Sequence, residues 1–513
     1  EWNASTIAYT DHRGHPTAYV GEYIRTKNGA TAFEAMLARV MDQLVRYESS
    51  KYKQQHLVSF INDPQHDPFV YDPQVAKRLA KFCQLDIEHL EATDNFESGL
   101  FASYRVYQFV PDFWLYLSKE QKQKLGDLPD RVDKSQQYDG YTQLLAEYHT
   151  MPVIIVSFSY SSARGMADMH KEARLTERRQ GEMLVDAYKD IIASGCNGAV
   201  VSGLTDYWGQ RTWNASYAVD LNRTYMWHDL QSSAQGTGLL AFVPGENNRI
   251  VTVDGDSSEW FETEPLLEKG GLKLYVKYDE EGLYLSITGD VSPAVPLYVS
   301  FDLTPKTGSK TFSDARLQFY RGIDFVLELK GENGESRLMV QERYEALRAN
   351  FLYETQRQDA YVNPPDKDSE LFVPILQAVI PLVFQPQTPA GQVPPAQYST
   401  IETGILVEGN ADADSENYNS LADYCYGPGV VEVRIPWAML NFSDPSRMMI
   451  HDDYYENYGV KSIAINKMEI GLTAAGGRTE FQTLPLNGWD TVPVHLRRKQ
   501  SYYILQQEWR RRL

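Results

Sequence analysis

Polar, charged and aromatic side chains follow four separate apolar runs in the first half of the chain. These groups are Asn62 with Asp63, residues Tyr107–Asp112, residues Ser157–Arg164 and residues Asp206–Trp213. Carboxylates can transfer protons, and aromatic rings offer a flat face to a ligand. If the four runs are parallel strands, their carboxyl ends meet at one edge, where α/β barrels carry their active sites. The sequence therefore predicts a site at that edge.

The elements that would position these groups alternate between strand and helix. The apolar residues of Thr31–Lys53 recur at intervals of three and four after a Thr31–Glu34 capping box, which predicts an amphipathic helix. The further expected elements are strands at 57–62 and 99–109, a helix at 141–149, a strand at 152–158, a helix at 176–194 ended by Gly195, and a strand at 197–204. This alternation indicates right-handed βαβ units and a parallel sheet.

The pattern changes near Pro244, where helical periodicity gives way to strict alternation of apolar and polar residues. The expected strands are 272–278 with 283–287 and 323–330 with 337–341 as two hairpins, and 431–435. We therefore expect an all-β sandwich after about residue 250, with the proline-rich stretch Gln385–Gln397 as a long loop inside it.

Four segments resemble motifs of bacterial glycoside-hydrolase-like (β/α)8 proteins of the clan A type. The segment Pro152-Val-Ile-Ile-Val-Ser-Phe-Ser-Tyr-Ser-Ser-Ala-Arg164-Gly165 resembles their seventh-strand motif, approximately P-V-x-V-S-E-F-G-x-P-S-S-R-G. The segment Leu204-Thr-Asp-Tyr-Trp-Gly-Gln-Arg-Thr-Trp-Asn214 resembles their eighth-strand motif, approximately W-Q-D-E-W-F-K-R-T-W-N. Residues Lys51–Asn62 and Phe101–Phe113 are similar to further stretches of the same group. The resemblance covers nearly all of residues 1–245 and implies the carboxyl half of a TIM-type barrel.

Several positions depart from the family's motifs. Where the seventh-strand motif has the Glu that retaining glycosidases use as nucleophile, this chain has Ser157. Retaining hydrolysis needs two carboxyl groups about 5–5.5 Å apart, and a serine without a neighbouring base replaces neither. The motif's Gly becomes Ser159, the Glu after Asp206 becomes Tyr207, and Gly209 replaces a Phe. The resemblance therefore implies a lost or altered activity.

Two acidic residues are the candidates for any remaining catalysis. Glu1-Trp2 resembles the Glu-Trp that ends the family's fourth strand, which implies that Glu1 is a remnant of the proton donor; an ordinary exposed Glu is the alternative. Asp206 lies in the eighth-strand motif and is either a pocket residue or the cap of the next turn.

Six further residues are candidates for substrate binding. They are Asn62, Tyr107, Arg164, Tyr207, Trp208 and Trp213. For the two tryptophans, stacking on a sugar competes with packing at the barrel mouth. Arg164, like Arg211, either orients site carboxylates or forms a structural ion pair.

The later part of the chain has its own resemblance. Residues Val253–Trp260 resemble the opening of family-nine carbohydrate-binding modules and related DOMON-like sandwiches, and Val431–Trp437 resembles a late strand of theirs. Asp254 and Asp256 could contribute oxygens to a Ca²⁺ site, whereas Asp-Gly-Asp is also a common tight turn, which we favour. No other cofactor is expected.

Composition limits the classes of partner. The 513 residues carry 49 Lys and Arg against 69 Asp and Glu, a net charge of −20 that repels phosphate backbones, so nucleic acid is not an expected partner. The longest apolar stretch, Ile375–Phe384, is about half of the ~20 residues that a membrane span needs. Three widely separated cysteines form no disulfide framework. Because the chain starts at Glu1 without an initiator Met, we expect a processed or truncated product.

The sequence as a whole predicts a multidomain protein. We expect a glycosidase-like α/β barrel part at 1–245, a carbohydrate-binding-module-like β-sandwich at 250–495 and a solvated basic tail at 496–513. The resemblance places the protein outside the cell or on its surface. Three hypotheses remain open: an inactive glycosidase-like protein that binds carbohydrate or serves as a surface component, a glycosidase with displaced carboxylates, and a subunit of an extracellular assembly.

The barrel part contains too few strands to close. About four strand–helix units precede residue 245, whereas a closed barrel has eight. A parallel half-sheet alone leaves its edges and its apolar inner face open to water. We therefore expect the missing strands to come from an N-terminal half-barrel segment or from a partner chain.

Overall fold

The computed structural model describes residues 2–70, 81–107, 138–167, 174–380, 398–474 and 479–512. Contacts within the chain divide it into two compact units. The first holds the described residues of Glu1–Tyr160 and Glu182–Ser202, and the second holds those of Ser161–Gly181, Gly203–Pro381 and Pro394–Leu513. The predicted loop Gln385–Gln397 lies outside the described residues.

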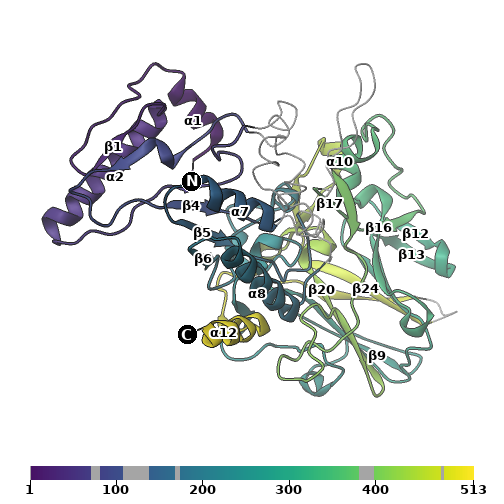
Figure 1. Ribbon diagram of the computed structural model, residues 1–513. Coiled ribbons are helices and arrows are strands. Elements are labelled where there is room, and N and C mark those ends of the chain that lie inside the picture. Colours follow the sequence, from purple (N-terminus) through teal and green to yellow (C-terminus); the bar gives the residue numbers. More distant parts are fainter. Residues whose placement is uncertain are drawn as a thin grey trace. The chain divides into compact units, whose positions relative to one another are not determined.

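The first unit contains a four-stranded parallel sheet, as the alternation of strands and helices predicts. Its strands, in spatial order, are β2 (Ile61–Asn62), β4 (Ala102–Arg105), β5 (Val153–Phe158) and β6 (Gly198–Val201). Figure 1 shows β4, β5 and β6 side by side, with helix α7 (Tyr138–Tyr148) and the later turns of α8 (Glu177–Ala193) next to them. In the described part of this unit the sheet stays open at β2 and β6, and no barrel is formed.

The predicted amphipathic helix of the first unit is present as α2 (Ala32–Lys51). The Thr31 hydroxyl accepts a hydrogen bond from the Glu34 N–H at 3.2 Å, and the Glu34 carboxylate accepts one from the Thr31 N–H at 2.8 Å. This confirms the predicted capping box, which satisfies two amides that a helix start otherwise leaves unpaired. The unit also contains α1 (Ala4–Asp11) and the antiparallel pair β1 (Ile24–Thr26) and β3 (Leu90–Ala92).

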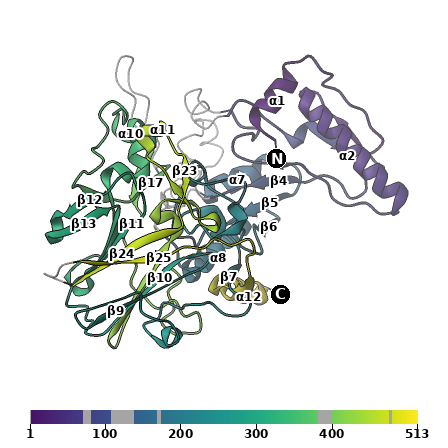
Figure 2. The ribbon, with the colours of Figure 1, turned by 180° about the vertical axis from the view of Figure 1, so that it is seen from behind.

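Two antiparallel sheets form most of the second unit (Figure 2). The five-stranded sheet has the order β19 (Tyr424–Gly427), β20 (Val430–Pro436), β10 (Gly282–Thr288), β9 (Leu272–Tyr278) and β8 (Leu267–Lys269). The six-stranded sheet has the order β16 (Phe372–Pro374), β15 (Arg337–Gln341), β14 (Phe325–Leu329), β11 (Leu297–Asp302), β24 (Lys467–Ala474) and β25 (Glu480–Pro485). Both predicted hairpins are confirmed, because β9 pairs with β10 and β14 pairs with β15.

The two sheets share one hydrophobic core. Leu285 and Val433 of the five-stranded sheet and Val299 and Leu327 of the six-stranded sheet are all fully buried in the same cluster. Alternation along each strand produces this arrangement, since every second side chain points to the same face. The later half of the chain therefore buries the apolar face of both sheets together.

Smaller elements complete the second unit. They are β12 (Ser309–Phe312) with β13 (Leu317–Ile323), β17 (Leu376–Val379) with β18 (Ser399–Glu402), the sheet of β21 (Phe442–Asp444), β22 (Met449–His451) and β23 (Ser462–Ala464), and helices α9 (Trp213–Ser216), α10 (Ala346–Gln356) and α11 (Tyr454–Asn457). Among the described residues, no helix combines the length and the hydrophobicity needed to span a membrane.

The C-terminal segment differs from the expected solvated tail. Strand β26 (Val494–Arg498) pairs antiparallel with β7 (Leu240–Pro244), and helix α12 (Gln500–Arg512) follows. Two of its basic residues pair with acidic side chains of the same unit, Arg497 with Glu177 and Lys499 with Asp206. Acidic residues that are distant in the sequence therefore hold this segment in place, although its composition alone predicts a solvated tail.

Candidate functional site

Asp206 lies buried beside strand β7 of the second unit. Its backbone N–H donates to the Leu240 carbonyl at 2.8 Å, and Thr205 pairs with Leu240 in parallel orientation, so the segment is held against β7. The residue is 3% exposed. Its Oδ1 accepts hydrogen bonds from Lys499 Nζ at 2.7 Å and from the Gly238 N–H at 2.9 Å. The carboxylate is thus part of a buried ion pair.

Lys499 is positioned between β26 and α12 to reach this carboxylate. Its backbone N–H donates to the Leu239 carbonyl at 3.0 Å. Its ammonium donates to Asp206, to Ser162 Oγ at 3.1 Å and to the Gly236 carbonyl at 3.1 Å. An ammonium has three donors, so every one of them has a protein acceptor.

Burial and hydrogen bonding act on the pKa of Asp206 in opposite directions. Burial raises the pKa of Asp206 above its ordinary value, while the Lys499 ammonium and the Gly238 N–H oppose that shift. Nearby, burial alone would raise the pKa of Glu177, but the Arg497 guanidinium outweighs it and lowers that pKa. Both the ammonium and the amide are directed at the same buried oxygen, Oδ1, so the carboxylate is poorly placed to reach a substrate. The pair is well suited to a structural role.

The aromatic residues after Asp206 have different environments. Trp208 is 5% exposed and stacks on the His228 ring at 5.1 Å with the planes 10° apart. Trp213 stacks on Tyr398 at 4.9 Å. Tyr207 is 58% exposed. Of these three candidates, Tyr207 is therefore the most accessible to a ligand from solution, whereas Trp208 packs inside the unit.

A buried charge cluster explains why Trp208 packs as it does. His228 lies near Glu281, whose Oε1 accepts a hydrogen bond from Arg434 Nη1 at 3.0 Å and whose Oε2 pairs with Arg249. Burial lowers the pKa of His228 to about 3, so the imidazole is neutral. Burial alone would raise the pKa of Glu281, but the two guanidinium groups lower it to about 2. The Trp208 ring covers one face of the His228 imidazole in this charge-paired cluster.

Arg164 is held by a structural ion pair. Its Nε and Nη2 donate to the Asp423 carboxylate at 3.0 Å, Nη2 also donates to the Ile405 carbonyl, and Nη1 donates to the Thr403 carbonyl. Both side chains of the pair are almost fully buried. This geometry corresponds to the structural alternative for Arg164, because each of its three guanidinium nitrogens donates to a residue of its own unit.

Three candidates lie in the first unit. Asn62, on β2, donates from Nδ2 to the Leu85 carbonyl at 2.9 Å and is 3% exposed. Tyr107 and Ser157 are brought together at the carboxyl ends of β4 and β5, where their hydroxyl oxygens lie 2.7 Å apart. In the described residues, no carboxylate or imidazole bonds to the Ser157 hydroxyl that would act as its base. Glu1 lies outside the described residues.

The proposed Ca²⁺ ligands serve the backbone of their own loop. Asp254 Oδ1 accepts a hydrogen bond from the Asp256 N–H at 2.8 Å, and Asp256 Oδ1 accepts one from the Ser258 N–H at 3.1 Å. This is the pattern of a tight turn. Within the described ranges, no group of three or more His, Cys, Asp or Glu side chains is arranged to hold a metal ion.

Lys499 is the residue of this site that sequence reasoning missed. Lys499 lies among the basic residues of the C-terminal segment, and the composition of that segment gives no sign of an acidic partner. Nothing in the local sequence distinguishes Lys499 from the neighbouring Arg497 and Arg498, so no local signal identifies it.

The sequence matches no model of a known protein family, and a search of curated proteins gives no match either. The family resemblance therefore rests on the motifs quoted above.

Proposed function

We propose that this protein is a glycosidase-like protein without hydrolytic activity, which binds carbohydrate outside the cell or on its surface. In this proposal, the first unit and the 203–245 stretch are remnants of a TIM-type barrel, and the two antiparallel sheets form a carbohydrate-binding-module-like sandwich. Carbohydrate is the ligand class that both resemblances imply.

The buried Asp206–Lys499 pair carries the proposal. Ser157 stands where the resembling family has its nucleophile, so Asp206 is the remaining described acidic candidate for a catalytic role. The distance of 2.7 Å to the Lys499 ammonium and the 3% exposure favour a carboxylate that supports the fold. Glycosidases need two carboxyl groups facing the scissile bond, and this arrangement supplies none that faces solvent.

In the described part of the first unit the sheet ends at β2 and β6, which supports a partner for the barrel part. Ile61 on β2 and Val200 on β6 are 45% and 51% exposed, and Leu57 before β2 is 53% exposed. Apolar side chains at both edges of a parallel sheet are unusual, because such sheets are covered on both faces in known folds. A half-barrel segment or a partner chain that supplies the further strands would cover them.

Two assays test the proposed function. Purified protein is incubated with chromogenic aryl glycosides and polysaccharides, where we expect no turnover above a heat-treated sample. The same protein is screened on a glycan array, where we expect binding. Steady turnover that disappears in Asp206→Asn would contradict the loss of activity, and an array without any bound glycan would contradict carbohydrate binding.

A matched pair of variants locates the binding surface. Tyr207 and Tyr9 are 58% and 59% exposed, so Tyr207→Ala and Tyr9→Ala remove rings of equal accessibility. We expect Tyr207→Ala to weaken glycan binding about 3- to 10-fold, the value of one aromatic contact, and Tyr9→Ala to leave it unchanged. An equal loss of glycan affinity in both variants would show that the glycan does not bind at Tyr207.

A further inference from the structure

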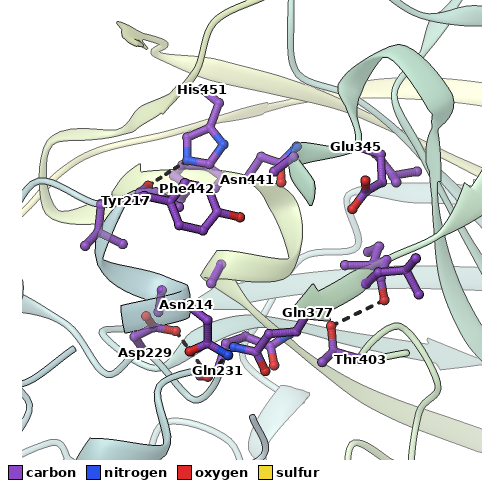
Figure 3. Close-up of a pocket in the computed structure, with 18 residues that line it drawn as sticks. Asn214, Tyr217, Asp229, Gln231, Glu345, Gln377, Thr403, Asn441, Phe442 and His451 are labelled. Atoms are coloured by element: carbon purple, nitrogen blue, oxygen red, sulfur yellow. Dashed lines mark hydrogen bonds between the residues drawn. The ribbon is translucent and has the colours of Figure 1, made fainter. Parts of the chain in front are cut away.

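A small polar cavity lies inside the second unit (Figure 3). Its volume is about 70 Å³. Polar groups of its lining bond to the chain itself. Asn214 Nδ2 donates to the carbonyls of Met166 and Ala378 at 2.6 Å, and Asn441 Nδ2 donates to the Tyr344 carbonyl at 2.7 Å. These groups hold parts of the second unit together, whereas the first unit carries an exposed surface whose pattern indicates a partner.

Helix α2 of the first unit is buried along one face. Phe33, Leu37, Met41 and Val45 recur every four residues and are at most 6% exposed. Figure 1 shows α1 and β1 beside this helix, and both pack against it. The remaining face of α2 carries the exposed residues of the helix.

The exposed face of α2 carries a second apolar stripe. Met36, Val40, Gln43 and Tyr47 are separated by four, three and four positions, which is the spacing of the a and d positions of a coiled coil. Val40 is 54% exposed, Tyr47 is 49% exposed, and Leu44 beside them is 47% exposed. Single exposed apolar residues are common, but a group on one side of a helix indicates a contact surface. We call these five residues the outer seam.

The charges that flank the outer seam are positive. With Val40 and Tyr47 at a positions, Arg39 and Arg46 occupy g positions and Lys51 an e position. All three are exposed, and no Asp or Glu within α2 is exposed. Arg46 lies 3.4 Å from a Glu22 oxygen, so part of its charge is compensated. Arg39 and Lys51 therefore present positive charge on both sides of the seam, in a chain whose net charge is −20.

This charge pattern selects among the possible occupants. A second copy of α2 would bring basic e and g residues against basic ones, which disfavours pairing. A lipid bilayer would receive the polar Gln43 at the centre of the seam, and the net charge of −20 repels anionic lipid. A helix with apolar residues at a and d and carboxylates at e and g complements both the seam and its flanks.

We propose that the outer seam of α2 is the docking surface for an acidic amphipathic helix of a partner protein. The 20 residues of α2 form a helix about 30 Å long. The partner's apolar side chains pack on Val40, Leu44 and Tyr47, and its carboxylates pair with Arg39 and Lys51. This surface lies apart from the edges of β2 and β6, and it stands if the glycan array is empty.

Two synthetic peptides serve as probes for the full chain. Both are three heptads long with Leu at every a and d position; the acidic peptide has Glu at every e and g position, and the basic peptide has Lys there. Fluorescence anisotropy of labelled peptide measures binding. The net charge of −20 attracts the basic peptide non-specifically, so a preference for the acidic peptide requires the local surface.

Two variants test the seam and its flanks separately. Val40→Glu places a negative charge in the seam, and the double variant Arg39→Glu with Lys51→Glu reverses the charge of both flanks. All three positions are exposed, so the fold is retained.

Matched controls lie outside α2. Val295→Glu changes a valine of similar exposure, 45% against 54%. The double variant Lys27→Glu with Lys310→Glu changes the net charge by the same amount as the flank reversal, at two exposed positions. Sedimentation with vesicles that contain phosphatidylglycerol tests a membrane as occupant, and sedimentation velocity of the protein alone tests a second copy.

We expect the acidic peptide to bind at least about 10-fold more tightly than the basic peptide. Val40→Glu should weaken that binding about 10-fold or more, and the flank reversal should make the basic peptide the preferred one, while both controls bind as the wild type does. Absence of binding, equal affinity for the two peptides, or unchanged binding in Val40→Glu would overturn the proposal. Binding to vesicles alone, or a dimer that Val40→Glu dissociates, would equally overturn it.

Discussion

The Lys499 ammonium lies 2.7 Å from the Asp206 carboxylate, although the two residues are 293 positions apart in the sequence. Both side chains are almost fully buried. A buried charge is tolerated when it is paired and hydrogen-bonded, and here each partner meets that condition through the other and through Gly236 or Gly238. The C-terminal segment thereby completes the environment of a residue that the sequence analysis names as a candidate for catalysis.

Removing the ammonium should destabilise the second unit strongly. Lys499→Met leaves Asp206 buried without its cation, which costs about 3–5 kcal/mol in the free energy of unfolding. The double variant Lys499→Met with Asp206→Asn removes both charges and should recover part of that loss. Urea denaturation measures each value.

The control for this prediction is Lys461→Met, because Lys461 is exposed. It should change the free energy of unfolding by no more than about 0.5 kcal/mol. A Lys499→Met protein as stable as the wild type would show that the ion pair contributes nothing, and would remove the main support for the proposed function.

The Arg164–Asp423 pair gives a second, graded prediction. Arg164→Met should cost about 3–5 kcal/mol because Asp423 loses its partner. Arg164→Lys keeps the charge but cannot reach Asp423 and the two carbonyls together, so we expect an intermediate loss of about 1–3 kcal/mol. Arg510→Met, on an exposed arginine of α12, is the control. An Arg164→Lys protein with wild-type stability would show that charge alone matters.

Local patterns predict the elements of this fold well. The Thr31–Glu34 capping box and the apolar spacing after it depend on residues three and four positions apart, and α2 has the expected start. The strand Pro152–Phe158 is an uninterrupted apolar run, and β5 occupies 153–158. In both cases the pattern and the element it predicts depend on residues close together in the sequence. The periodicity of apolar residues is therefore enough to predict the helix and the strand.

Pairing between distant residues leaves no comparable signal. Asp206 and Arg164 are singled out by type and motif, but their partners, Lys499 and Asp423, lie more than 250 positions away. A carboxylate at a strand end has the same local sequence whether it faces a substrate or a lysine. The sequence therefore identifies candidate residues, while their partners decide between structural and catalytic roles.

Gly238 should tolerate no side chain. A Cβ at this position would lie 2.2 Å from the Asp206 backbone nitrogen and 2.2 Å from the Thr205 carbonyl carbon. We expect Gly238→Ala to lower the free energy of unfolding by about 1–3 kcal/mol through overpacking against backbone. In Gly198→Ala the new Cβ would meet Ile154 at an ordinary 3.5 Å, so this control should retain or slightly gain stability. Equal melting temperatures in the two variants would contradict the close approach beside Asp206.

The buried carboxyl of Glu432 predicts a pH dependence of stability. Its oxygens accept hydrogen bonds from Trp260 Nε1 at 2.6 Å and from the N–H groups of Gly255 and Asp254. Burial raises the pKa of Glu432 from 4.5 to about 7, despite these donors. In the unfolded chain the carboxyl ionises above about pH 4.5, whereas in the folded protein it keeps its proton up to about pH 7. The stability that this group contributes is therefore complete below pH 4.5 and is lost as the pH rises to 7.

Comparison with Glu432→Gln isolates this effect from the other titrating groups. The amide keeps an oxygen for the Trp260 indole and does not ionise. We expect the stability of the wild type relative to Glu432→Gln to fall by about 3 kcal/mol at most between pH 4.5 and pH 7, since one pKa unit corresponds to about 1.4 kcal/mol. Urea denaturation at several pH values measures the difference. Glu416→Gln, on an exposed glutamate, should show a constant difference from the wild type. A Glu432→Gln difference that is equally constant, or that grows as the pH rises, would show that Glu432 is ionised in the folded protein throughout this range.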